Sequence, residues 1–137
     1  MQRSDTQTIS IDAPREAVLD LVSNPTAFPR WASGFARAVR VDGPDLVVET
    51  GGDEVRLRVR VSREHGTVDF LPASALRAEL GVFTRTVPNG RGCDFALTRF
   101  FTDAMTATEV DDERAVVAVE LQTVRVLCER GEVRAAA

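Results

Sequence analysis

The segment from residue 8 to residue 35 constrains the fold of this chain more than any other part of the sequence. Polar and apolar residues alternate at its start, which predicts a strand over residues 4–11. Pro14 fits the first position of a following helix, because that position needs no backbone N–H donor. The Asn-Pro pair at residues 24–25 ends this helix, and residues 28–31 predict a short second one. The chain is therefore expected to open with a strand and two short helices.

Alternation of apolar and polar residues continues from residue 38 to residue 101, with turn residues between the runs. These runs predict strands at residues 39–41, 46–50, 54–63, 67–71, 76–87 (bent at Gly81) and 93–101. In the run at 54–63, four apolar residues from Val55 to Val61 point to one side, which we expect to face the last helix. The other side carries Arg56, Arg58 and Arg60. We expect these arginines to lie in solvent and to pair with acids such as Glu49 and Glu79.

A long helix is predicted near the C-terminus, from residue 106 to about residue 130. Thr106 and Glu109 have the spacing of a capping box. An apolar stripe recurs at helical spacing and consists of Val117, Leu121, Val124 and Cys128. The acids from Asp111 to Glu113 lie near the helix N-terminus, where negative charge is favoured. Gly131 ends the helix, and residues 131–137 are expected to form a frayed tail.

The predicted order is a strand, two short helices, about six strands and a long helix. In such an α+β order, a helix covers the apolar face of an antiparallel sheet. The Ala-Pro helix start, Phe28-Pro29-x-Trp31, the Pro-Asn-Gly turn at 88–90 and the final helix, in this order, resemble the START-like (SRPBCC, polyketide cyclase/dehydrase-like, helix-grip) superfamily. The resemblance implies one START-like domain over residues 1–137. In that fold, a curved antiparallel sheet of about six to seven strands wraps around the C-terminal helix and leaves a cavity between them.

Composition limits the partners and the compartment. A net charge of −4 argues against nucleic acid as a partner, because phosphate binding needs clustered positive charge. No apolar run approaches the ~20 residues of a membrane helix, and no basic stretch followed by an apolar run predicts a signal peptide. Cys93 and Cys128 fit no zinc spacing and are expected to be small buried residues. A reducing cytoplasm is the simplest location, and the codon bias implied by the composition suggests a bacterial source.

The residue types also limit the chemistry. All 17 basic residues are Arg and there is no Tyr, which excludes a Schiff-base lysine and a tyrosine acid. His65 is the only histidine, and its tight Glu-His-Gly turn predicts an exposed residue rather than a base. The acidic run that begins at Glu109 lacks the ligand pattern of a calcium loop. We expect neither a metal nor a cofactor, and the sequence identifies no catalytic residue.

The resemblance implies a ligand site between the sheet and the last helix. We expect a mostly apolar lining with few polar anchors, formed by Trp31, Val59, Phe70, Phe95, Leu97, Arg99 and Leu121. Trp31 fits either a core position or the cavity opening. Arg99 lies on an apolar strand face, where an unpaired charge would be costly. It either pairs with an acid such as Glu120 or Asp69, or reaches water, or holds an anionic group of a ligand.

The predicted function is binding of a hydrophobic or aromatic small molecule in this cavity. Two alternatives remain: a polyketide cyclase or aromatase that folds its substrate into a reactive shape, and a non-catalytic protein-interaction module. The size of the cavity separates them, because a void well below ~300 Å³ would indicate a packed scaffold rather than a binding site.

Overall fold

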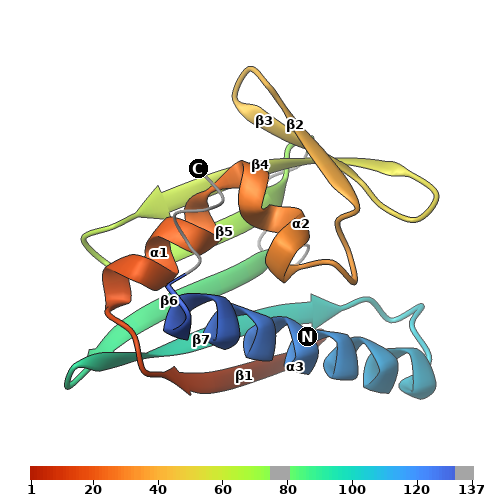
Figure 1. Ribbon diagram of the computed structural model, residues 1–137. Coiled ribbons are helices and arrows are strands. Elements are labelled where there is room, and N and C mark those ends of the chain that lie inside the picture. Colours follow the sequence, from red (N-terminus) through yellow and green to blue (C-terminus); the bar gives the residue numbers. More distant parts are fainter. Residues whose placement is uncertain (75–80, 132–137) are drawn as a thin grey trace.

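An antiparallel sheet and a long helix form the framework of the protein (Figure 1). The computed structural model describes residues 1–74 and 81–131. Within them, seven strands form one sheet in the order β1-β7-β6-β5-β4-β3-β2, and all neighbouring strands are antiparallel. The elements are β1 (Arg3–Ile11), α1 (Arg15–Ser23), η1 (Pro25–Ala27), α2 (Phe28–Trp31), β2 (Ala38–Asp42), β3 (Asp45–Glu49), β4 (Glu54–Ser62), β5 (Thr67–Pro72), β6 (Val82–Asn89), β7 (Gly92–Phe101) and α3 (Ala107–Glu129). The predicted α+β, helix-grip arrangement is confirmed.

The opening segment folds as predicted except at Pro14. This residue has an extended backbone, with φ −66° and ψ 150°, and it is the N-cap of α1 rather than its first helical residue. The inner face of α1 is buried and consists of Val18, Leu19, Leu21 and Val22. The Asn24 side chain accepts a hydrogen bond from the Thr26 backbone N–H at 3.1 Å. This cap starts the 3-10 turn η1, which carries the chain directly into α2.

Helix α3 lies along β1 and is also contacted by α1 and α2 (Figure 1). Its start is the predicted capping box: Thr106 Oγ1 accepts from the Glu109 backbone N–H at 3.1 Å, and the Glu109 carboxylate accepts from the Thr106 backbone N–H at 3.0 Å. The predicted stripe from Val117 to Cys128 is buried. It joins residues of α1, α2 and the sheet in one hydrophobic cluster, and the burial of this cluster holds the helix on the sheet.

Strand β4 keeps the predicted alternation, but its apolar side is covered over only part of its length. Leu57 is buried, whereas Val61 is 45% exposed. Val61 lies opposite the buried Val68 in the β4–β5 register, so it keeps the predicted side of the strand but is not covered there. This residue lies next to the end of β4, where the helices leave its side chain uncovered.

The arginines of β4 form a cross-strand ladder with partners other than the expected ones. Arg56, Arg58 and Arg60 pair with Asp42, Asp45 and Asp69 at 2.8–3.5 Å. Glu49 lies opposite Glu54 in the β3–β4 register, and Glu79 lies outside the described residues. Arg56 and Arg60 are exposed and Arg58 is partly exposed, so solvent screening leaves these pairs with little effect on stability.

The strand predicted at residues 76–87 begins at Val82, and residues 76–80 lie outside the described part of the chain. At Gly81, a Cβ atom would lie 2.8 Å from Leu71 Cδ2 and 3.1 Å from the Phe70 carbonyl oxygen. The close approach of β5 therefore leaves no room for a side chain at this position.

The C-terminal tail predicted at residues 131–137 lies outside the description, except for Gly131. Gly131 has a φ of 70°, the left-handed conformation that commonly ends a helix. No helix within residues 1–74 and 81–131 combines the length and the hydropathy needed to cross a membrane. Cys93 and Cys128 are free thiols and are buried, as predicted.

Candidate functional site

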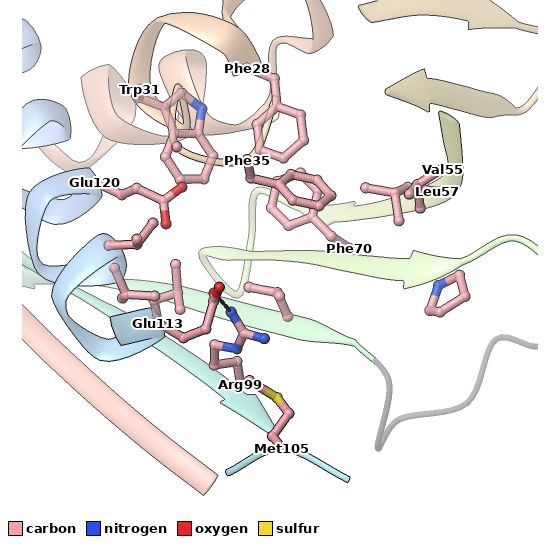
Figure 2. Close-up of a pocket in the computed structure, with 16 residues that line it drawn as sticks. Phe28, Trp31, Phe35, Val55, Leu57, Phe70, Arg99, Met105, Glu113 and Glu120 are labelled. Atoms are coloured by element: carbon pink, nitrogen blue, oxygen red, sulfur yellow. Dashed lines mark hydrogen bonds and ion pairs between the residues drawn. The ribbon is translucent and has the colours of Figure 1, made fainter. Parts of the chain in front are cut away.

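A pocket of about 410 Å³ lies between the sheet and helix α3 (Figure 2). Its walls come from α2 and the loop after it, from β4 to β7, and from α3. The lining consists of Phe28, Trp31, Gly34, Phe35, Val55, Leu57, Phe70, Pro72, Val82, Leu97, Arg99, Met105, Glu113, Val116, Val117 and Glu120. Most of these residues are apolar, and the volume falls within the roughly 300–1,000 Å³ of small-molecule sites.

Four aromatic rings form one wall of the pocket. The rings of Phe28 and Phe70 are stacked, with centroids 5.1 Å apart and planes 10° apart. The Trp31 ring lies 5.3 Å from Phe28 and 6.1 Å from Phe70. Trp31 is 2% exposed, so it is a core residue and also lines the pocket. The ring centroids of Phe35 and Phe28 are 6.0 Å apart. Phe35 is 38% exposed, which places it at the mouth of the pocket.

The mouth lies where the loop after α2 approaches helix α3. Gly34 in this loop is exposed and lines the pocket. A Cβ atom on Gly34 would lie only 2.8 Å from Val116 Cγ1. The lack of a side chain at residue 34 therefore allows the loop to approach α3 this closely, and a larger residue there would narrow the opening.

An ion pair occupies the opposite, polar end of the pocket. Arg99 Nη1 on β7 donates to Glu113 Oε2 on α3 at 2.6 Å (Figure 2). The guanidinium also lies 4.9 Å from the centroid of the Phe101 ring, within the range of a cation–π contact. Arg99 Nε is buried and has no hydrogen-bond partner among the described residues. The ion pair and the ring hold the arginine at the pocket wall.

Glu120 is the second acid of α3 in the lining, and Figure 2 shows its carboxylate beside the ring of Trp31. It forms no hydrogen bond or ion pair with another described residue. Burial raises the pKa of Glu120 to about 7, and the negative charge of Glu113 adds to this rise, while the positive charge of Arg99 opposes it. At neutral pH, this carboxyl therefore exists in both its protonated and its ionised form.

Four of the seven residues predicted to bind ligand line the pocket: Trp31, Phe70, Leu97 and Arg99. Phe95 and Leu121 are 0% and 3% exposed and belong to the hydrophobic cluster, outside the lining. Phe95 lies four residues before Arg99 on β7, which is about 13 Å away at the rise of a strand. Val59 packs against the same cluster and also lies outside the lining.

Sequence reasoning missed the role of the acids Glu113 and Glu120 in the lining. Glu113 was expected to stabilise the helix N-terminus, and Glu120 was considered only as a partner of Arg99. Their positions carry a signal, because 113, 117, 120 and 124 recur at three- and four-residue intervals on one helix face. This spacing places both acids beside the apolar stripe, as on any amphipathic helix, and only the structure assigns them to the pocket.

The other candidate groups lie away from the pocket. His65 is exposed, and its Nδ1 lies 2.8 Å from Ser62 Oγ, which fits the predicted turn position. Within the described residues, no cluster of three or more His, Cys, Asp or Glu side chains could hold a metal ion. A second hollow, of about 440 Å³, lies at the β3–β4 turn and is lined by exposed or partly exposed residues from Arg37 to Glu54. The pocket under α3 is thus the better candidate site.

Comparison with known proteins links the fold to several solved structures. No family model and no curated protein matches this sequence. A START superfamily protein from Mycobacterium smegmatis has a TM-score of 0.74 at 11% identity, covering 93% of this chain and 97% of that one. The Aha1 dimer from Colwellia psychrerythraea has a TM-score of 0.71 at 13% identity, covering 93% and 96%.

The di-domain ARO/CYC protein StfQ, from the steffimycin biosynthetic pathway, has a TM-score of 0.71 at 16% identity. The match covers 96% of this chain and 47% of StfQ. TM-scores of 0.71–0.74 establish similarity of fold, whereas identities of 11–16% leave the ligand to be argued from the pocket itself.

Proposed function

Because the chain has a START-like fold, we propose that its pocket binds an apolar, ring-containing small molecule. The observation that carries this proposal is the 410 Å³ pocket with an aromatic wall at one side and one ion pair at the other. Apolar walls with a few placed polar groups are typical of small-molecule sites. The volume also argues against a packed scaffold whose outer surface alone is functional.

The walls suggest how such a ligand would lie. The faces of Phe28, Trp31 and Phe70 would pack against a ring of the ligand in stacked or tilted geometry. The Arg99 guanidinium would approach an oxygen at the other end of the ligand, since only its Nη1 is engaged by Glu113 among the described residues. Burial of apolar surface would supply most of the affinity and the oxygen would set the orientation.

Fluorescence of Trp31 tests this proposal directly. Trp31 is the only Trp, and there is no Tyr, so its emission reports on the pocket wall without background. Titration with polyketide-like, flavonoid-like and fatty-acid-like compounds should shift or quench this emission in a saturable way. The same compounds should raise the Tm through binding to the folded state. If no compound in the panel changes either signal, the proposal fails and the interaction-module alternative gains support.

A cyclase or aromatase is the second candidate function, and Glu120 is the observation that favours it. A carboxyl with a pKa near 7 suits general acid–base chemistry at neutral pH. Glu120 would remove a proton from a carbon between two carbonyl groups, and the electron pair would move onto an oxygen near Arg99. The carbanion would then attack the carbon of a third carbonyl group to close a ring, the electron pair of that carbonyl would move onto its oxygen, and Glu120 would return the proton to this alkoxide.

An aryl-substituted 1,3,7-triketone tests this second candidate, because the carbon between its first two carbonyls can attack the third to close a six-membered ring. Incubation with the protein should yield a cyclised product, and its dehydration should appear as loss of one water in the mass spectrum. Glu120→Gln should abolish product formation while leaving the triketone bound. Equal product yield from Glu120→Gln would exclude this role of the carboxyl.

A further inference from the structure

Three charged residues line the pocket within the described part of the chain: Arg99 and Glu113, which form the ion pair, and Glu120 on the same helix as Glu113. Arg99 projects from β7, and Glu113 and Glu120 project from α3 (Figure 2). The other walls present uncharged side chains: Phe28 and Trp31 from α2, Val55 and Leu57 from β4, Phe70 and Pro72 from β5, Val82 from β6, and Gly34, Phe35 and Met105 from loops. Among the described residues, these three therefore set the charge of the lining.

The net charge of these three residues depends on whether the Glu120 carboxyl is protonated. Arg99 and Glu113 form an ion pair and cancel each other. Glu120 forms no hydrogen bond or ion pair with another described residue, so its proton decides whether the described lining is neutral or carries one negative charge. An extra charge acts strongly on a ligand here, because the surrounding apolar walls lower the effective dielectric.

We propose that Glu120 makes ligand selection proton-dependent: an apolar molecule with an anionic head group binds beside Arg99 when Glu120 is protonated and is rejected when Glu120 is ionised. A neutral molecule of the same shape binds equally well in both states. This inference rests on the proposed function, since it concerns the same pocket.

The size of the effect follows from the fraction of protein that is competent to bind. With a pKa of about 7, Glu120 is about nine-tenths protonated at pH 6 and about one-tenth protonated at pH 8. If only the protonated form accepts the anion, the apparent Kd rises in inverse proportion to this fraction. The affinity for an anionic ligand should therefore fall about tenfold between pH 6 and pH 8.

Two fluorescent probes with one ring skeleton separate charge from shape. The probe 1-anilinonaphthalene-8-sulfonate is anionic throughout this pH range, and N-phenyl-1-naphthylamine has the same rings without the sulfonate. We expect the sulfonate probe to bind about tenfold more weakly at pH 8 than at pH 6. The neutral probe should bind with the same Kd at both pH values.

The variant Glu120→Gln assigns the effect to one residue. Gln keeps the size of the side chain and cannot ionise, so the sulfonate probe should bind at pH 8 as it does at pH 6. Asp112→Asn is the matched control, because Asp112 is exposed on the same helix and lies outside the pocket lining. It should retain the tenfold loss of affinity of the unmodified protein.

A measurement on the unmodified protein covers the case in which the variant does not fold. Coupling between two binding events is reciprocal. A saturating concentration of the sulfonate probe should therefore raise the pH at which the Glu120 carboxyl carbon titrates in NMR, whereas the neutral probe should leave it unchanged.

The outcomes distinguish this inference from the proposed function. If both probes bind saturably but the pH dependence is equal for the two, or persists in Glu120→Gln, the inference is overturned and the binding function stands. If neither probe binds saturably at either pH, the proposed function fails and the inference falls with it. A loss confined to the sulfonate probe and abolished by Glu120→Gln supports both.

Discussion

Replacement of Glu120 by Gln should stabilise the protein at alkaline pH and have little effect at acid pH. Burial raises the pKa of this carboxyl from 4.5 to about 7 in the folded state. Between these values, the folded chain binds more protons than the unfolded chain, so the free energy of unfolding decreases as pH rises. Well above pH 7, the buried negative charge lowers the free energy of unfolding by its full amount. Gln carries no charge, so the variant does not lose this stability.

The magnitude follows from the same shift. One pKa unit corresponds to about 1.4 kcal/mol, so the rise from 4.5 to about 7 corresponds to about 3 kcal/mol. Glu120 is only partly buried, and water screening reduces the expected gain to about 1–3 kcal/mol at pH 8. For a chain of 137 residues, this gain raises the Tm by about 4–10 °C.

Urea unfolding at pH 5 and at pH 8 measures this difference between Glu120→Gln and the unmodified protein. The comparison isolates residue 120, because the other titrating groups are common to both proteins. Asp112→Asn should show no comparable gain at pH 8. A Glu120→Gln protein that is less stable than the unmodified protein at pH 8 would refute the reasoning, since it would mean that the ionised carboxyl is stabilised in the fold.

Three further changes test other parts of the structure. Gly34→Val should narrow the mouth of the pocket against α3 and weaken probe binding in fluorescence titrations, with a lower Tm because its Cβ would lie 2.8 Å from Val116 Cγ1; Gly52→Val, whose Cβ meets no atom within 4 Å, should bind normally. Arg99→Ala should weaken binding of the sulfonate probe by about 1.5–3 kcal/mol if the guanidinium holds the anion; loss of stability with unchanged binding would instead establish a purely structural ion pair. Leu121→Ala should cost about 2–5 kcal/mol in urea unfolding, and Val119→Ala, at a position 64% exposed, should cost far less.

The fold was predictable because its local signals agree with one another. The capping box at Thr106 fixes the start of α3, and the stripe from Val117 to Cys128 fixes its buried face. Alternation predicts the strands but does not show how far other elements cover their ends, so the exposure of Val61 was not foreseen. Alternation also leaves the cross-strand partners open, because pairing depends on strand register; Asp45 rather than Glu49 therefore meets the arginines of β4.

The site was predictable only where a residue type was unusual for its position. Trp31 and Arg99 stand out in the sequence, since one is the only Trp and the other is a charge on an apolar strand face. Phe95 and Leu121 have the same apolar pattern as the lining residues and are as buried as Leu97, so the pattern does not show which of them faces the pocket. Glu120 looks like an ordinary surface acid of a helix, and only the three-dimensional arrangement shows that it faces a pocket.

The two buried thiols, one on the sheet and one on the last helix, report when the core opens. Cys93 on β7 and Cys128 on α3 are 1% and 4% exposed, and burial raises the pKa of both, that of Cys128 to about 12. Alkylating reagents attack thiolates, so neither sulfur reacts while the helix is seated on the sheet. The rate of alkylation in the absence of denaturant then reports how often α3 separates from the sheet and exposes the thiols. A ligand that bridges α3 and the sheet would slow this rate, which makes ligand binding measurable without any label on the ligand.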